Sequence, residues 1–168
     1  MSELAYNGAA RLVGNDVNTD YIISSRRKRD TLDEKELAKY LMEDVDPHFA
    51  ATVQPGDILV AGANFGCGSA MEIAALVIRG AGIPAIVAKS YSRTFYRNGI
   101  NNGILLACCD TAGIWPGDSL TVKGENSRIR VTNHRTGETL DAGSLPSELM
   151  DIVRAGGIVE YMKQRRRQ

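Results

Sequence analysis

The sequence is short of the residues that most often bind metals or form disulfides. It has three cysteines, of which Cys108 and Cys109 are adjacent, and two histidines, His48 and His134, far apart in the chain. These spacings match no zinc or haem site. An odd cysteine count without a paired spacing is typical of a reduced compartment. We therefore expect no metal site in this chain and a cytoplasmic location.

The chain also has no net charge, few aromatic residues and no long hydrophobic run. Its 20 basic and 20 acidic residues balance, and aromatic residues make up 6 %. Without a basic surplus or interleaved aromatics, a nucleic-acid partner is disfavoured, although basic runs occur at residues 26–29 and 165–167. No apolar stretch approaches the roughly 20 residues that span a bilayer. The first residues, which include Glu3, do not resemble a signal peptide. We expect no membrane partner.

What is present is an alternation of apolar runs and amphipathic segments. The length suits one domain with a real core. Strands that alternate with helices predict an α/β core, and two runs with a turn between them predict a hairpin toward the C-terminus. The expected strands are residues 9–13, 57–61, 84–88, 104–108, 119–123 and 128–132, and the expected helices are residues 33–42, 70–78, 92–98, 147–154 and 158–163.

The most informative segment is the glycine-rich stretch at residues 62–72, between an expected strand and an expected helix. It reads Gly-Ala-Asn-Phe-Gly-Cys-Gly-Ser-Ala-Met-Glu. Glycines let the backbone turn sharply, and the first amides of a following helix can hold an anion. A P-loop would need Lys in place of Ser69, a dinucleotide loop Gly or Ala in place of Met71, and a hydrolase elbow Gly in place of Cys67. Ser69 at the expected helix start could be a simple helix cap or a reactive hydroxyl.

Several segments together resemble a known family. Residues 64–69 followed by Glu72 resemble the signature of the small subunits of 3-isopropylmalate dehydratase and homoaconitase, which also occurs in the mobile C-terminal domain of aconitase. The segments 18–23, 89–98, 99–103 and 156–161 resemble further parts of that family in the same order. The resemblance spans nearly the whole chain.

The resemblance implies a fold and an incomplete enzyme. It implies a swivelling β/β/α domain over residues 1–168, acting as one half of a two-subunit iron-sulfur hydro-lyase for a hydroxy-dicarboxylic or tricarboxylic acid. The first candidate is 3-isopropylmalate dehydratase of leucine biosynthesis. In this family a large subunit carries a [4Fe-4S] cluster that acts as a Lewis acid. We expect no cluster on this chain, no activity alone, and a heterodimer or heterotetramer with that subunit.

The resemblance also assigns site residues. Ser69 falls on the family's catalytic serine, which moves a proton at the carbon beside a carboxylate, and Asp20 on an acidic residue that organises the site. A loop or cap aspartate is the alternative for Asp20. The basic segment at residues 26–29 falls on the substrate-specificity loop, or is a solvated loop. Its arginines could bind a carboxylate in two-point fashion. The substrate-binding candidates are Arg26, Arg27, Arg29, Asn64, Gly68, Ala70 and Met71, with a structural turn as the alternative for Asn64.

One position departs from the family pattern. Where the family has Ser-Arg-Glu after its catalytic serine, this chain has Ala70-Met71-Glu72. That arginine binds a substrate carboxylate, and Met71 cannot replace its charge. The basic segment could supply the cation instead, or the substrate could be of the homoaconitase, dimethylmalate, citramalate or maleate type. A non-catalytic aconitase-like binding module is the third alternative. Arg93 and Arg97 match family positions too, and we expect partner packing or internal ion pairs for them.

Overall fold

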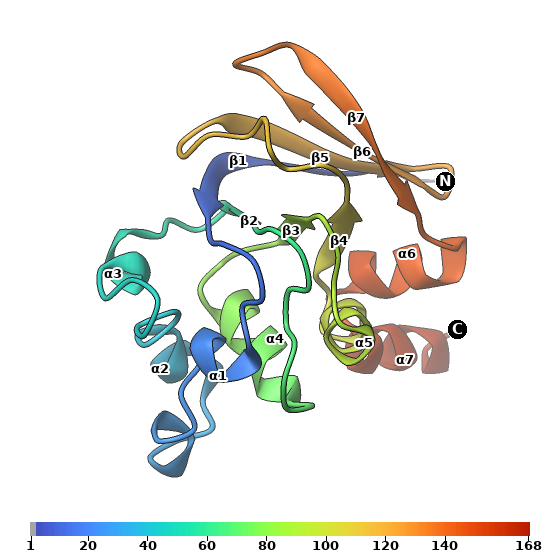
Figure 1. Ribbon diagram of the computed structural model, residues 1–168. Coiled ribbons are helices and arrows are strands. Elements are labelled where there is room, and N and C mark those ends of the chain that lie inside the picture. The colour runs from blue at the N-terminus through green and yellow to red at the C-terminus, as the bar shows by residue number, and fades with distance from the viewer. Residues whose placement is uncertain (1–2) are drawn as a thin grey trace.

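A curved, mixed sheet of seven strands organises residues 3–168, the part of the chain that the computed structural model describes (Figure 1). The strand order is β4-β3-β2-β1-β5-β6-β7. Strands β1 to β4 run parallel and β5 to β7 antiparallel, with β1 between the two halves. The strands are β1 (Leu4–Leu12), β2 (Ile58–Val60), β3 (Ala85–Ala88), β4 (Leu105–Cys108), β5 (Ser119–Glu125), β6 (Arg128–Asn133) and β7 (Glu138–Ser144).

The parallel half confirms the predicted α/β core. Strands β2 and β3 are buried along their whole length, as near-continuous apolar runs in parallel sheets usually are. Strand β1 begins at Leu4, earlier than expected, because its first half pairs with β5 rather than with β2. Since β1, β2, β3 and β4 are parallel, the loops that follow them all leave the same edge of the sheet. Binding sites in such sheets usually lie at this carboxyl edge.

The antiparallel half contains the predicted hairpin and one strand that was not expected. Strands β5 and β6 pair around Asn126 and Ser127, both of which have positive φ. Strand β7 has few β-branched residues, which is why its sequence does not predict a strand. It forms by pairing with β6, with a register shift between Arg128 and Arg130. Strands β6 and β7 also contact β4, so the sheet curls over its own parallel half (Figure 1).

Short helices cover the parallel strands, and two further helices follow β7. The helices are α1 (Thr19–Ile22), the 3-10 turn η1 (Arg27–Arg29), α2 (Glu34–Ala38), α3 (Phe49–Thr52), α4 (Glu72–Gly80), α5 (Arg93–Asn101), α6 (Ser147–Ala155) and α7 (Ile158–Arg166). Helices α1 and α3 were not expected. The helix expected at residues 33–42 is shorter, because turns replace it before Met42, whose φ is 59°.

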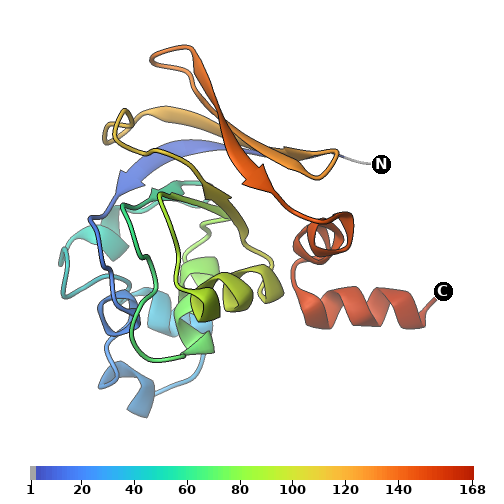
Figure 2. The same cartoon turned by 45° about the vertical axis from the view of Figure 1, so that its right-hand side comes forward.

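Helix α5 contacts both α4 and α6, and α6 in turn contacts α7. Ser92 caps α5 by accepting a hydrogen bond from the amide of Phe95. Helix α6 ends at Gly156, whose φ of 91° suits a glycine after a helix. Helix α7 buries none of its residues and lies at the outer side of α6 (Figure 2). Among the described residues, none of the helices has the length and apolar character needed to cross a membrane.

Candidate functional site

The glycine loop, residues 62–71, leaves β2 at the carboxyl edge of the sheet and pairs with the segment that follows β1. The amide of Gly66 donates to the carbonyl of Val17 over 2.8 Å, and the amide of Thr19 donates to the carbonyl of Cys67 over 2.9 Å. These bonds join the two loops as a short parallel bridge. The sheet edge therefore holds the glycine loop and the start of α1 side by side.

Two glycines are required for this arrangement. Gly66 and Gly68 have φ values of 80° and 90°, which disfavour any residue with a side chain. A Cβ on Gly66 would collide with Phe95 of α5, and a Cβ on Gly68 would collide with the side chain of Asn18. The two glycines thus allow the loop to turn, and they also allow it to pack closely between α1 and α5.

Ser69 is exposed at the end of this loop, and the structure corrects one expectation about it. Helix α4 begins at Glu72, and Met71 is its N-cap residue, so Ser69 does not cap the helix. The carbonyl of Ser69 accepts a hydrogen bond from Thr19 Oγ1 over 2.9 Å, which anchors its backbone. Its hydroxyl has no hydrogen-bond partner among residues 3–168. The backbone is fixed while the side chain stays available to a ligand.

Asp20 lies close to this serine, because it directly follows Thr19. It occupies the first turn of α1, where the Asn18 side chain accepts a hydrogen bond from its amide over 2.9 Å. Asn18 is therefore the helix cap, and the cap alternative considered for Asp20 is not observed. The Asp20 carboxylate is exposed and makes no ion pair within residues 3–168. The structure thus brings together the two residues expected to be catalytic.

The basic segment splits into two pairs of cations. Arg27 donates to both carboxylate oxygens of Glu43 over 2.9 Å and lies 4.0 Å above the Tyr40 ring. Arg26 reaches Glu43 over 3.2 Å and Asp44 over 3.4 Å. The hydrogen bond from Arg27 lowers the pKa of Glu43. Both arginines are thus engaged within the chain, which favours a structural role for them over direct substrate binding.

The other two cations, Lys28 and Arg29, have no carboxylate partner in the described part of the chain. Lys28 is half-buried, and its Nζ lies 2.6 Å from Met71 Sδ. A thioether is only a weak acceptor, so the ammonium keeps most of its capacity to bind an anion. Arg29 is exposed at the end of η1. The sequence analysis named the three arginines and not Lys28, because a planar guanidinium suits bidentate carboxylate binding; the position of Lys28 beside Met71 depends on the turn η1.

The remaining candidates, Asn64, Gly68 and Ala70, are residues of the glycine loop itself. Asn64 has a φ of 58°, its amide donates to Ser90 Oγ over 2.7 Å, and its side chain donates to Asp16 over 3.1 Å. These contacts match the structural-turn alternative. Gly68 and Ala70 are exposed beside Ser69. At the start of α4, the amides of Glu72 and Ile73 find no acceptor within residues 3–168, so they face the same region unpaired.

The chain's own residues do not fit an iron-sulfur cluster. Cys67 lies in the glycine loop, whereas Cys108 and Cys109 are at the end of β4. No group of three or more histidine, cysteine, aspartate or glutamate side chains in the described range is arranged to hold a metal ion. What the site offers is an exposed hydroxyl, a carboxylate, an ammonium group and free amides. Such a set can bind a carboxylate and move a proton.

Comparison with known proteins gives the family of the chain. Residues 15–108 match the family described as the aconitase C-terminal domain. The 3-isopropylmalate dehydratase small subunit of Oleidesulfovibrio alaskensis is 44 % identical over 164 residues, covering 96 % of each chain. The chain belongs to this family.

Two archaeal relatives extend the comparison. The isopropylmalate/citramalate isomerase small subunit of Methanocaldococcus jannaschii is 44 % identical over 154 residues, covering 90 % of each chain. A crystal structure of 3-isopropylmalate dehydratase from the same organism superposes with a TM-score of 0.90 at 37 % identity, covering 97 % of this chain and 96 % of that one. The α/β swivel fold expected from the family resemblance is confirmed.

Proposed function

We propose that this chain is the small subunit of a heteromeric hydro-lyase, 3-isopropylmalate dehydratase, and that Ser69 is its proton-transferring group. The observation that carries the proposal is the Ser69 hydroxyl, exposed and unpaired within residues 3–168 on a backbone fixed by Thr19. Membership of a hydro-lyase family supports the reaction class. The match over nearly the full length of small subunits supports a large subunit as partner, in the cytoplasm, within leucine biosynthesis.

In dehydration, Ser69 would take the proton from the carbon next to a substrate carboxylate. The electron pair of that C–H bond becomes the new C=C bond, and the hydroxyl on the neighbouring carbon leaves as hydroxide, which takes a proton from a general acid on the partner's side of the site and becomes water. When water adds back to the C=C bond in the opposite orientation, Ser69 returns a proton to one carbon and the hydroxyl bonds to the other, so the hydroxyl has moved to the neighbouring carbon. A serine base requires a positive local potential, since its hydroxyl is weakly acidic. The unpaired amides at the start of α4 and the nearby Lys28 ammonium supply that potential.

Lys28 would bind the substrate carboxylate that the family's arginine binds at the position of Met71. Its Nζ touches Met71 Sδ, so the ammonium group lies where the missing guanidinium would begin. Arg29 is the second candidate, because Arg26 and Arg27 are paired with Glu43. The flexible, apolar Met71 would then contact the branched alkyl part of the substrate. This division of roles suits a hydroxy-diacid with an aliphatic substituent, such as 3-isopropylmalate or citramalate.

The [4Fe-4S] cluster expected for this family would belong to the large subunit. The cysteines of this chain supply no ligand set for it, as described above. The catalytic unit would therefore form only when the carboxyl edge of the sheet faces the partner. Whether the complex is a heterodimer or a heterotetramer, each Ser69 would need one partner site.

The test is anaerobic reconstitution with a 3-isopropylmalate dehydratase large subunit, followed by hydro-lyase assays on a panel of acids. The panel contains 3-isopropylmalate, citramalate, 2,3-dimethylmalate, homocitrate and maleate. We expect turnover of 3-isopropylmalate to be the fastest, with citramalate next. A faster reaction with another acid would move the substrate assignment to it. No turnover of any of them by a complex that has formed would support the non-catalytic binding module and sink the proposal.

A further inference from the structure

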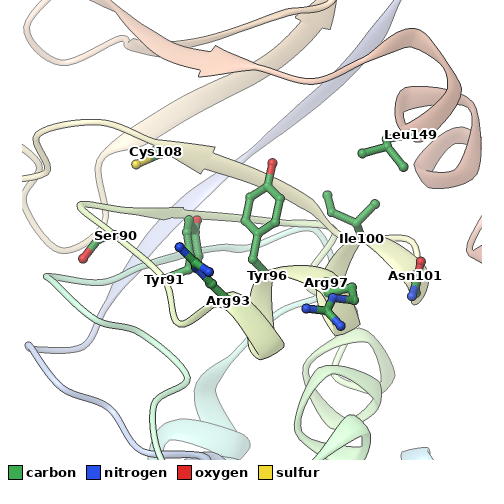
Figure 3. Close-up of a pocket in the computed structure, with 9 residues that line it drawn as sticks. All are labelled: Ser90, Tyr91, Arg93, Tyr96, Arg97, Ile100, Asn101, Cys108 and Leu149. Atoms are coloured by element: carbon green, nitrogen blue, oxygen red, sulfur yellow. The ribbon is translucent and has the colours of Figure 1, made fainter. Parts of the chain in front are cut away.

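A pocket of about 540 Å³ lies along helix α5, between that helix, the end of β4 and α6 (Figure 3). Helix α5 forms one wall, the end of β4 the floor, and Leu149 of α6 the far side (Figure 3). Its apolar surface comes from Tyr91, Tyr96 and Ile100, together with Leu149. No part of the site described above occupies this pocket.

One end of the pocket contacts the first residues of the glycine loop. Ser90 lines it and also accepts the hydrogen bond from the amide of Asn64 in the glycine loop. Tyr91 forms a bridge with Phe65 of the same loop, and Phe95 packs edge-on against Phe65 with ring centroids 5.0 Å apart. A protein that covers the Ser69 region is therefore in position to reach the pocket as well.

The rim of the pocket carries two unpaired positive charges. Arg93 and Arg97 are exposed, line the pocket and make no ion pair within residues 3–168. They stand four residues apart on α5, where like charges destabilise a helix by about 0.2–0.5 kcal/mol. Of the two roles expected from the sequence, internal ion pairing is therefore not observed. A carboxylate from outside the chain would relieve the repulsion.

We propose that this pocket is the docking site of the large subunit, and that it takes an aliphatic or aromatic side chain flanked by Asp or Glu. The inference rests on the proposed function, because it takes the large subunit as the partner. The apolar floor accommodates the anchor side chain, and the two arginines bind the flanking carboxylates. Tyrosine and arginine around an apolar centre are the composition enriched at protein interfaces. Ser90 at one end of the pocket is bonded to Asn64 in the glycine loop, so a partner that covers this loop would lie next to the pocket.

The pocket's tyrosines are suited to this role in different ways. The hydroxyl of Tyr91 lies 3.0 Å from the carbonyl of Ile86 and 2.7 Å from that of Ala107, so Tyr91 is fixed as part of the wall. Burial raises its pKa well above the usual value, so it stays neutral. The hydroxyl of Tyr96 has no hydrogen-bond partner among the described residues and is free to meet a partner group.

The experiment measures the affinity of the full chain for the large subunit, anaerobically and without substrate. We expect Arg93→Glu/Arg97→Glu to weaken binding by at least about tenfold, because like charges would then face each other across the interface. Affinity of the unmodified chain should fall as salt rises, and that of the double variant should not. The matched control is Arg130→Glu/Arg166→Glu, with the same charge change at exposed positions outside the pocket. It should change affinity by less than about twofold.

A second variant tests the apolar part. Tyr96→Ala/Leu149→Ala should weaken binding by at least about tenfold while the chain keeps its far-ultraviolet circular dichroism spectrum. Unchanged affinity in either pocket variant, or equal weakening by the control, would overturn the proposal. The proposal would also be overturned if the unmodified chain bound a small branched-chain acid such as isovalerate and the pocket variants lost that binding while they kept normal affinity for the large subunit. The pocket would then be a small-molecule site.

The two proposals fail in different ways. A complex that forms with the expected dependence on the pocket, but turns over none of the acids, would refute the proposed function alone. A complex that turns over 3-isopropylmalate while Arg93→Glu/Arg97→Glu binds normally would refute the docking site alone.

Discussion

The polar groups in the two halves of the sheet differ in whether they have hydrogen-bond partners within the chain. In the antiparallel half, the buried Asp118 accepts hydrogen bonds from Arg135 at 2.7 Å, Asn133 at 2.8 Å and the amide of Trp115 at 2.8 Å. Arg135 also lies 3.8 Å above the Trp115 ring. At the carboxyl edge of the parallel half, by contrast, the Ser69 hydroxyl and the Asp20 carboxylate have no partner within the described residues.

This difference distinguishes polar groups that stabilise the fold from polar groups that are available to a ligand. Buried polar groups that hydrogen-bond to one another stabilise a fold, because each bond offsets the cost of removing both groups from water. Groups that are held by well-ordered backbone but left unpaired gain nothing for folding and are available to a ligand. The Lys28 ammonium, with only a thioether beside it, belongs to the second class. We therefore expect substitutions at the carboxyl edge of the parallel half to lower turnover, and substitutions in the antiparallel half to lower the stability of the fold.

The largest effect is expected for Ser69→Ala. Loss of a positioned proton-transferring group should lower turnover by the reconstituted complex about 10²- to 10⁴-fold. The melting temperature should not change, because the hydroxyl makes no hydrogen bond within residues 3–168. Steady-state assays and thermal unfolding of the same preparation check both parts. Retained turnover would remove Ser69 from the mechanism.

A smaller effect is expected for Lys28→Met, which removes the cation beside Met71. A charge-assisted hydrogen bond contributes about 1.5–3 kcal/mol, so kcat/KM for 3-isopropylmalate should fall about 10- to 100-fold. Met71→Arg in the same variant should restore part of the loss by returning a cation to the site. Arg26→Met is the control, since that arginine is exposed and pairs with Glu43 and Asp44. Equal losses in the control and in Lys28→Met would contradict the separation of these cations.

Ser92→Ala tests a serine near the same edge that has a structural role. Its hydroxyl caps α5 and donates to the carbonyl of Gly66 over 2.8 Å. We expect the free energy of unfolding to fall by about 1 kcal/mol, measured by urea denaturation. Turnover per folded complex should change far less than in Ser69→Ala. A larger loss of turnover in Ser92→Ala than in Ser69→Ala would contradict the roles given to the two serines.

The smallest effect on turnover is expected for Asp118→Asn, which should instead change acid stability. The Arg135 hydrogen bond lowers the pKa of Asp118 from 3.8 to about 2. A lowered pKa in the folded state stabilises the protein above the unfolded-state value, and this contribution is lost as the pH falls toward 2. The variant should therefore unfold at a slightly higher pH, with a flatter pH dependence between about 4 and 2. Circular dichroism during acid titration measures this, and an unchanged profile would show that Asp118 does not contribute.

The sequence predicted the parallel half well because its strands are apolar runs bounded by turns. Helix α5 was also predicted, since Ser92 is a favoured cap. The strand β7 was missed, because its formation depends on pairing with β6 rather than on its own composition. Helices α1 and α3 are single turns, too short for periodicity to reveal.

The candidate site was predicted in part. The glycine pattern singled out Ser69, and the family resemblance named Ser69 and Asp20 as candidates. The structure places them in adjoining segments that are bonded to each other. The contribution of each cation at residues 26–29 depends on how η1 turns and on where Glu43 lies, both of which are tertiary features. The pocket beside α5 could not be predicted either, because Leu149 reaches it from α6, far along the chain.

The proposed function requires that this chain supply the proton-moving half of a shared active site. It is tested most directly by adding the purified chain stepwise to a cluster-loaded 3-isopropylmalate dehydratase large subunit under anaerobic conditions and following 3-isopropylmalate turnover. We expect no turnover by either subunit alone and a rate that rises until the two are present in equal amounts. A large subunit whose rate is the same with and without this chain would contradict it.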